Sequence, residues 1–155
     1  MKPVVIRRER IVTIPVDVVW QLVEPIEALP AWLPFVVRSQ HLGGQGLGRR
    51  QRVTVNWGRR ATEIVQEVTD YRPNQTLAWT PVAERTGGQG IASVPSGVTM
   101  RVSMESMGPG TRVVIEAQQT PPTFGAWLAL RVVDKRRMVA GFDRALRTLA
   151  SVGGV

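Results

Sequence analysis

The sequence predicts an α+β fold in which a curved antiparallel sheet of about seven strands wraps around a long C-terminal helix. The first observation is a series of short segments in which apolar and polar residues alternate, joined by turns rich in glycine and proline. The second is an apolar stripe at helical spacing near the C-terminus. A sheet with one apolar face must bury that face, and a single long helix is the only large cover that this chain offers.

The N-terminal part predicts one strand followed by two short helices. Residues Val4–Ile14 have the pattern of a strand. Asp17 then lies in the first turn of a short helix, where a carboxylate suits the positive helix terminus. That helix should stop at Pro25, because a proline disfavours helix at the residue before it. A second one-turn helix, Ile26–Leu29, should stop in the same way at Pro30.

Six further strands are expected to form a meander of neighbouring antiparallel strands. Their expected bounds are Phe35–Leu42, Arg49–Trp57, Ala61–Tyr71, Gln75–Val82, Val98–Glu105 and Thr111–Gln118. In the second of them, Val53, Val55 and Trp57 share one face. Residues Glu84–Gly97 are rich in glycine, serine and proline and predict a loop.

The long helix is expected to begin at Pro121-Pro122-Thr123, with Thr123 as its N-cap, and to end at Gly153-Gly154. Its apolar stripe comprises Phe124, Leu128, Val132, Val139, Phe142, Leu146 and Leu149. Because the chain contains neither internal repeats nor a low-complexity linker, we expect one domain over residues 1–155.

Composition excludes several classes of site. The 155 residues include no cysteine, which removes disulfides, thiolate metal sites and cysteine nucleophiles. Charged residues interrupt the N-terminal apolar segment before a signal sequence can form, and no apolar stretch has transmembrane length. We therefore expect a cytoplasmic protein. The net charge of +8 allows contact with nucleic acid or an anionic membrane, but it equally describes a solvated basic surface.

A set of short motifs occurs in a recognisable order over nearly the whole chain. The motifs are Ile14–Trp20, Leu29–Trp32, Gly46–Gly48, Val68–Pro73, Leu77–Trp79 and Gly110–Val113. This set resembles the START-type SRPBCC superfamily of the helix-grip fold, which contains the polyketide cyclase/dehydrase and lipid-transport families. The resemblance implies an apolar pocket between sheet and helix, but the fold hosts carriers, cyclases, sensors and regulators alike. The chain departs from the usual pattern at Glu24-Pro25, where an aspartate is frequent.

The five tryptophans are the most informative side chains, because each combines a large apolar area with one polar group. They either fill the core or line a ligand pocket, which methionines would help to shape. The expected ligand-binding residues are Trp32, Val55, Trp57, Gln66, Trp79, Met100, Met104, Ile115, Trp127, Leu128 and Val132. Gln66 shares its strand face with Ile64 and Val68, so we expect it to orient the ligand.

Candidates for catalysis are few. His41 is the only histidine and lies near a turn, which favours a surface or structural role over acid–base chemistry. With Gln66 and Tyr71 it completes the set of candidate proton-handling residues. One histidine, no cysteine and no carboxylate cluster give no basis for a metal site, and we expect no cofactor. The glycines of residues 43–48 lack the pattern of a nucleotide-binding loop and predict turn geometry.

Three functions are consistent with these features. The first is binding or transport of a small hydrophobic ligand such as a lipid, isoprenoid or polyketide, with Glu84–Gly97 and the short helices around the pocket mouth. The second is a polyketide cyclase or dehydratase. The third is a regulatory or interaction module that docks on a partner through its basic face. Transient contact with an anionic membrane is expected of a lipid carrier, which must dock where its cargo resides. The C-terminal helix lacks the interleaved aromatics and the helix-turn-helix pattern of nucleic-acid binders, and the sequence leaves the oligomeric state open.

Overall fold

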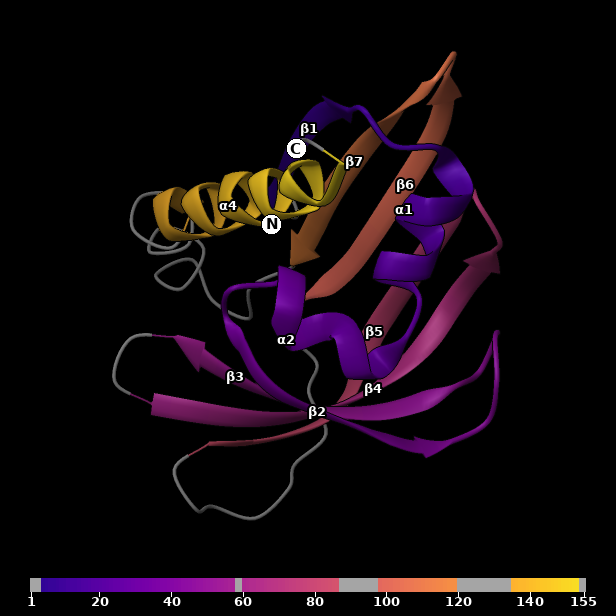
Figure 1. Ribbon diagram of the computed structural model, residues 1–155. Helices are drawn as coiled ribbons and strands as arrows, with labels where there is room; N and C mark the ends of the chain where they lie inside the picture. Colours follow the sequence, from indigo (N-terminus) through magenta and orange to yellow (C-terminus); the bar gives the residue numbers. More distant parts are fainter. Residues whose placement is uncertain (1–3, 58–59, 87–97, 120–134, 154–155) are drawn as a thin grey trace.

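The computed structural model describes residues 4–57, 60–86, 98–119 and 135–153. Figure 1 shows its elements in sequence colours. The strands are β1 (Val4–Val12), β2 (Val36–Gly43), β3 (Arg50–Trp57), β4 (Arg60–Arg72), β5 (Thr76–Thr86), β6 (Thr99–Met107) and β7 (Gly110–Gln119). The helices are α1 (Val16–Val23), the 3₁₀ helix η1 (Ile26–Ala28), α2 (Leu29–Trp32) and α4 (Lys135–Gly153).

All seven strands form one antiparallel sheet in the order β1-β7-β6-β5-β4-β3-β2. The first two strands of the chain therefore lie at opposite edges, and α1, η1 and α2 carry the chain from one edge to the other. The sheet is strongly curved, and these short helices and α4 lie together over its inner face (Figure 1). The α+β class and the helix-grip arrangement predicted from the sequence are confirmed.

Two predicted boundaries were wrong for local reasons. Pro30 does not stop a helix but lies in the first turn of α2, where the missing backbone N–H has no intrahelical partner to lose. The expected strand Gln75–Val82 continues to Thr86, because the long β4 still offers a partner there, with Thr62 opposite Thr86. Residues 84–86 of the predicted loop are thus strand, and the remainder of that loop lies outside the described residues.

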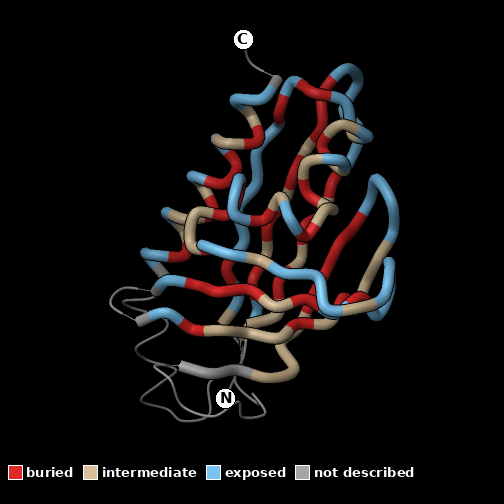
Figure 2. Tube along the Cα trace, turned by 60° about the horizontal axis from the view of Figure 1, so that its bottom comes forward, coloured by how far each residue is buried: buried red, intermediate tan, exposed pale blue. Residues whose placement is uncertain are grey.

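The core lies between the inner face of the sheet and α4 (Figure 2). Of the predicted helical stripe, Phe142, Leu146 and Leu149 are buried and Val139 is half-buried. The three members before residue 135 lie outside the described part of the chain. The buried strand residues of this core include Val53, Val55, Val68, Leu77, Trp79, Met100, Val102, Val113 and Ile115. A buried polar side chain on this inner face is therefore an exception among apolar neighbours.

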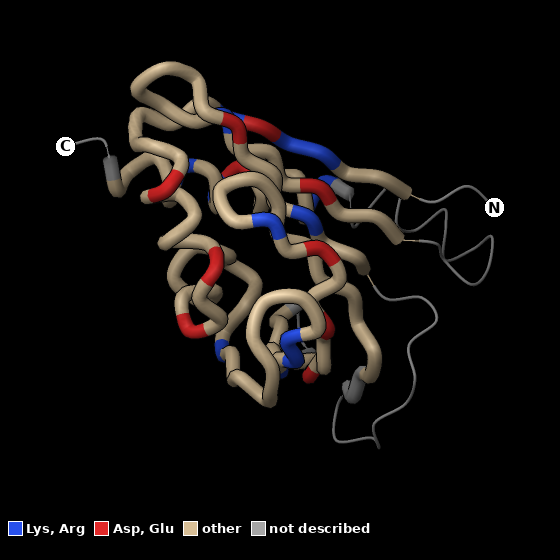
Figure 3. The backbone as a smooth tube through the Cα atoms, turned by 90° about the vertical axis from the view of Figure 1, so that its right-hand side faces the viewer, with Lys and Arg blue, Asp and Glu red and all other residues tan. Residues whose placement is uncertain are grey.

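Charged residues of both signs lie beside one another on the strands, as Figure 3 shows for one side of the molecule. Asp70 accepts hydrogen bonds from Arg72 and from Arg101, the latter at 2.7 Å. The bonds from Arg72, followed by those from Arg101, lower the pKa of Asp70 to about 2. On the far edge Arg8 of β1 binds both carboxylate oxygens of Asp143 and so ties α4 to the sheet. No helix in the described ranges is long and apolar enough to cross a membrane.

Candidate functional site

A row of buried polar side chains interrupts the apolar inner face at β3 and β4. It consists of Arg49, Gln51 and Gln66, which are 4%, 0% and 6% exposed, and we call it the polar row. Gln51 shares its face of β3 with the buried Val53, and the antiparallel register sets it opposite Gln66. The backbone carbonyl of Arg49 accepts a hydrogen bond from Val68 N at 2.9 Å, which positions Arg49 beside β4. The sequence thus places three polar groups where apolar ones would be expected.

The side chains of the polar row are joined head to tail. The Arg49 guanidinium donates from Nε and Nη2 to Gln51 Oε1, at 3.3 and 3.1 Å. Gln51 Nε2 then donates to Gln66 Oε1 at 2.8 Å. Because every one of these groups is buried, the bonds are worth more here than they would be in water.

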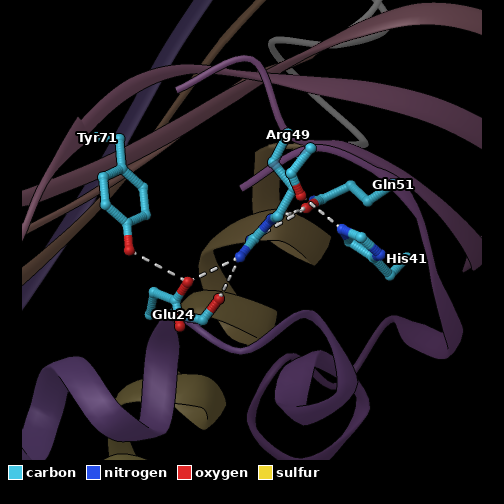
Figure 4. Close-up of polar contacts among 6 residues, drawn as sticks. Glu24, His41, Arg49, Gln51 and Tyr71 are labelled. Atoms are coloured by element: carbon cyan, nitrogen blue, oxygen red, sulfur yellow. Dashed lines mark hydrogen bonds and ion pairs between the residues drawn. The ribbon is translucent and has the colours of Figure 1, made fainter. Parts of the chain in front are cut away.

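At its other end the polar row meets the C-terminus of α1 (Figure 4). Arg49 Nη1 donates to Glu24 Oε1 at 2.9 Å and to the Glu24 backbone carbonyl at 3.0 Å. The side chain of Arg49 is 5% exposed and that of Glu24 24%, so the ion pair is only partly open to water. Glu24 is the C-cap of α1, so this contact fixes the end of that helix against the sheet.

Tyr71 extends the connection to the end of β4. Its hydroxyl donates to Glu24 Oε1 at 3.3 Å, as Figure 4 shows, and its ring meets that of Trp20 edge-on at 5.3 Å. Burial, and secondly the charge of Glu24, raises the pKa of the Tyr71 hydroxyl. The phenol is therefore a protonated hydrogen-bond donor over the whole physiological pH range.

The structure unites two of the three candidate proton-handling residues and separates the third. Tyr71 and Gln66 lie at the two ends of one hydrogen-bonded series that runs through Glu24 and the polar row. His41 is exposed on β2, and its Nε2 lies 2.7 Å from the carbonyl oxygen of Gly44. That contact lies within the turn between β2 and β3, away from the polar row.

The predicted ligand-binding residues divide by whether the structure describes them. Those that are buried in the core are Trp32, Val55, Gln66, Trp79, Met100, Met104 and Ile115. The side chain of Trp57, together with Trp127, Leu128 and Val132, lies outside the described part of the chain. Burial alone does not distinguish a lining residue from a packed one, so their contact with a ligand stays a prediction.

Trp32 has a feature that the sequence did not disclose. It is 4% exposed, and its indole Nε1 has no hydrogen-bond acceptor among the residues that the structure describes. Buried donors are nearly always paired, and an orphaned one costs about 1–3 kcal/mol. This group therefore calls for an explanation.

A separate concavity of about 520 Å³ lies beside the β6–β7 hairpin and the turn before β5. Polar side chains, among them Arg7, Asn74, Glu105 and Arg112, line it together with Val16 and Val114. Of the predicted ligand-binding residues it touches Met104. Over the described ranges no group of three or more histidine and acidic residues could hold a metal ion.

Sequence reasoning found Gln66 and Tyr71 but missed Glu24, Arg49 and Gln51. A signal for two of them was present: the alternation that puts Val53 and Val55 inward continues backward to Gln51 and Arg49. Glu24 stood out only as a departure from the family pattern, and nothing in the sequence connected it with Arg49, which lies 25 residues further along the chain.

The sequence was compared with known protein families. Residues 3–153 match the family described as polyketide cyclase / dehydrase and lipid transport. The chain belongs to this family. The resemblance to the START-type SRPBCC superfamily that the ordered motifs indicated is thereby confirmed. No curated protein sequence matches the chain significantly.

Solved structures with the same fold are numerous and distant in sequence. TTHA0849 from Thermus thermophilus is 20% identical, with a TM-score of 0.71 over 96% of this chain and 95% of that one. The Zhui aromatase/cyclase from Streptomyces sp. R1128 is 13% identical, with a TM-score of 0.72 over 97% and 93% of the two chains. CV1439 from Chromobacterium violaceum is 14% identical, with a TM-score of 0.66 over 97% and 98%. At these identities the likeness establishes the fold.

Proposed function

We propose that this protein binds a small hydrophobic ligand between the inner face of its sheet and α4. The observation that carries the proposal is the polar row on a largely apolar inner face. Replacing a buried ion pair by apolar residues of similar volume is often neutral or stabilising, so stability alone gives little reason to keep one. An apolar enclosure with a few fixed polar groups is the usual composition of a small-molecule site.

The surrounding residues and the family support the same function. Trp79, Met100 and Ile115 supply apolar area on the inner face, and methionine adapts to irregular shapes. Apolar ligand surface buried there contributes roughly 25 cal/mol per Å² before the costs of association are subtracted. The family description includes lipid transport, which is a carrier function.

Titration with the neutral fluorescent probe 1,6-diphenyl-1,3,5-hexatriene, a hydrocarbon without hydrogen-bond donors or acceptors, tests this proposal. We expect saturable binding at one site. The increase in probe emission and the quenching of tryptophan fluorescence both measure it. Val55→Trp places extra bulk on the inner face, where Val55 is 4% exposed, and should weaken binding strongly. Val37→Trp is the matched control, because Val37 is 53% exposed on β2 and its replacement should leave binding unchanged. Circular dichroism verifies that both variants are folded, and probe binding that never saturates would refute the proposal.

A second candidate function is catalysis of polyketide cyclisation and dehydration. It is favoured by the contact of Tyr71 with the Glu24–Arg49 pair, which joins a protonated phenol to a carboxylate and a guanidinium. The resemblance to the Zhui aromatase/cyclase agrees with it at the level of fold. Such a site could donate a proton from Tyr71 while a reactive chain is held nearby.

Heptane-2,4,6-trione is a simple substrate for testing catalysis. Ring closure forms one carbon–carbon bond and releases one water to give orcinol, which chromatography quantifies. A catalyst should accelerate orcinol formation, and Tyr71→Phe should remove most of the acceleration. Rates equal to those in buffer would exclude this activity.

Docking of the exposed arginines of α4 on a partner or an anionic membrane stays a prediction, which binding assays at increasing salt would test.

A further inference from the structure

The hydrogen-bond direction along the polar row is fixed by its first member. A guanidinium has donors and no acceptor, so Gln51 must turn its oxygen toward Arg49. The amide nitrogen of Gln51 must then face Gln66, and Gln66 must receive it with its own oxygen. The amide orientations, which are often ambiguous, are therefore determined by the network itself.

This direction leaves the amide nitrogen of Gln66 as the free end of the row. Within the described ranges, Gln66 Nε2 has no hydrogen-bond acceptor, although the residue is 6% exposed. The end of the row therefore presents N–H groups and no oxygen, at an atom that the protein does not fully enclose. Arg49 at the opposite end polarises the row and strengthens the donor character of that nitrogen.

Trp32 supplies a second and independent donor. Its indole N–H is buried and without an acceptor in the described part of the chain, and an indole nitrogen can only donate. Trp32 belongs to the same apolar cluster as Val53 and Val68, which neighbour the polar row on β3 and β4. Trp32 Nε1 is fully enclosed and Gln66 Nε2 is not, but both unpaired groups are donors, and neither can be satisfied by another donor.

We propose that the ligand carries an acceptor oxygen on an apolar body, as in a ketone, quinone or ester, and that Gln66 and Trp32 select it by donating hydrogen bonds. This inference rests on the proposed binding function and adds its chemical selectivity. A ligand without an acceptor would leave both donors unpaired, and a ligand with only a donor would add a third such group. The two residues thus determine specificity without contributing most of the affinity.

Three tricyclic compounds of nearly equal shape test the proposal by displacement of 1,6-diphenyl-1,3,5-hexatriene. Fluorenone presents a carbonyl oxygen, fluorene has no polar group, and carbazole presents only an N–H. We expect fluorenone to bind about three- to tenfold more tightly than fluorene, which corresponds to one net hydrogen bond. Carbazole should bind no better than fluorene.

Two variants assign the preference to the named residues. Gln66→Glu keeps the oxygen that receives Gln51 and replaces the free donor by an acceptor, so the order of fluorenone and carbazole should reverse. Trp32→Phe keeps an aromatic ring, removes the N–H and should narrow the preference for fluorenone. Gln40→Glu introduces the same change at an exposed position of β2 and should keep the wild-type order.

The outcomes separate this inference from the function on which it rests. If the probe binds saturably but fluorenone and fluorene compete equally, the donor selectivity is wrong and the binding function stands. A wild-type order that persists in both Gln66→Glu and Trp32→Phe would also overturn the assignment. If the probe does not bind saturably to the wild-type protein, the binding function itself fails.

Discussion

Replacement of Arg49 by methionine is the most direct test of the polar row. Methionine preserves much of the apolar stem of the side chain but removes every hydrogen bond of the guanidinium. Gln51 Oε1, which belongs to a fully buried residue, loses both of its donors, and Glu24 loses its cation. The change therefore removes the donors of Gln51 Oε1 and of the Glu24 backbone carbonyl, and it leaves the Glu24 carboxylate with the Tyr71 hydroxyl but without its cation.

The size of the effect follows from the burial of Gln51 and Glu24, the two residues that lose their partner. An orphaned buried acceptor costs about 1–3 kcal/mol, and breaking a fully buried ion pair costs about 3–5 kcal/mol. The Glu24 side chain is 24% exposed and can recover part of its hydration, which lowers the second figure. We expect Arg49→Met to reduce the free energy of unfolding by about 3 kcal/mol. For a chain of this length the loss corresponds to a fall in Tm of roughly 6–12 °C.

Guanidinium denaturation followed by tryptophan fluorescence measures the loss, and thermal melts by circular dichroism supply the Tm. An unchanged m-value would show that the mutation changed stability and not the extent of unfolding. Arg72→Met is the matched control, because Arg72 is 57% exposed and its partner Asp70 keeps Arg101. Equal Tm shifts for the two variants would refute the reasoning that burial makes the Arg49 contacts important.

Three further predictions concern other parts of the fold. Because the pKa of Asp70 is about 2 instead of 3.8, its stabilising effect should be complete above pH 3.8 and disappear as the pH falls toward 2. Unfolding of Asp70→Asn and wild type across pH 2–7 should show a stability gap that closes at the acid end, and a gap independent of pH would contradict the assignment. A Cβ at Gly110 would lie 2.5 Å from the backbone oxygen of Val12, so Gly110→Ala should destabilise by about 1–3 kcal/mol, whereas Gly43→Ala meets nothing within 4 Å and should be neutral in the same denaturation assay. Phe142→Ala empties a fully buried position on α4 and should cost about 3–5 kcal/mol, and a calorimetric Tm close to that of wild type would disprove the core placement.

The sequence predicted the architecture because periodicity is a local property. Each strand had to alternate in order to bury one face, and the described part of α4 had to present Phe142, Leu146 and Leu149 on one side. The errors arose where the outcome depends on a partner or on position within an element. The length of β5 is decided by β4, and the effect of Pro30 depends on whether it opens or continues a helix.

The candidate site was predictable only where its residues share a strand face with apolar neighbours. Gln66 satisfied that condition, and Gln51 would have done so if the alternation of β3 had been followed toward its start. The contact of Glu24 with Arg49 and the unpaired N–H of Trp32 are consequences of three-dimensional packing. No periodicity in the sequence encodes them.

The pairing of the first strand with the last has a consequence for synthesis of the chain. Glu9 and Arg112, whose side chains are hydrogen-bonded between β1 and β7, are 103 residues apart, a distance that a ribosome covers in roughly 5–20 seconds. Throughout that interval β1 has no strand to pair with. Each strand from β3 to β7 can instead pair with the strand before it as the chain leaves the ribosome. The charged run Arg7–Arg10 interrupts the apolar residues of β1 and so keeps the waiting strand from associating with other nascent chains. We expect a ribosome-bound chain arrested before β7 to be cleaved by protease within β1 and the finished protein to resist, so that these charges serve the chain before it is folded.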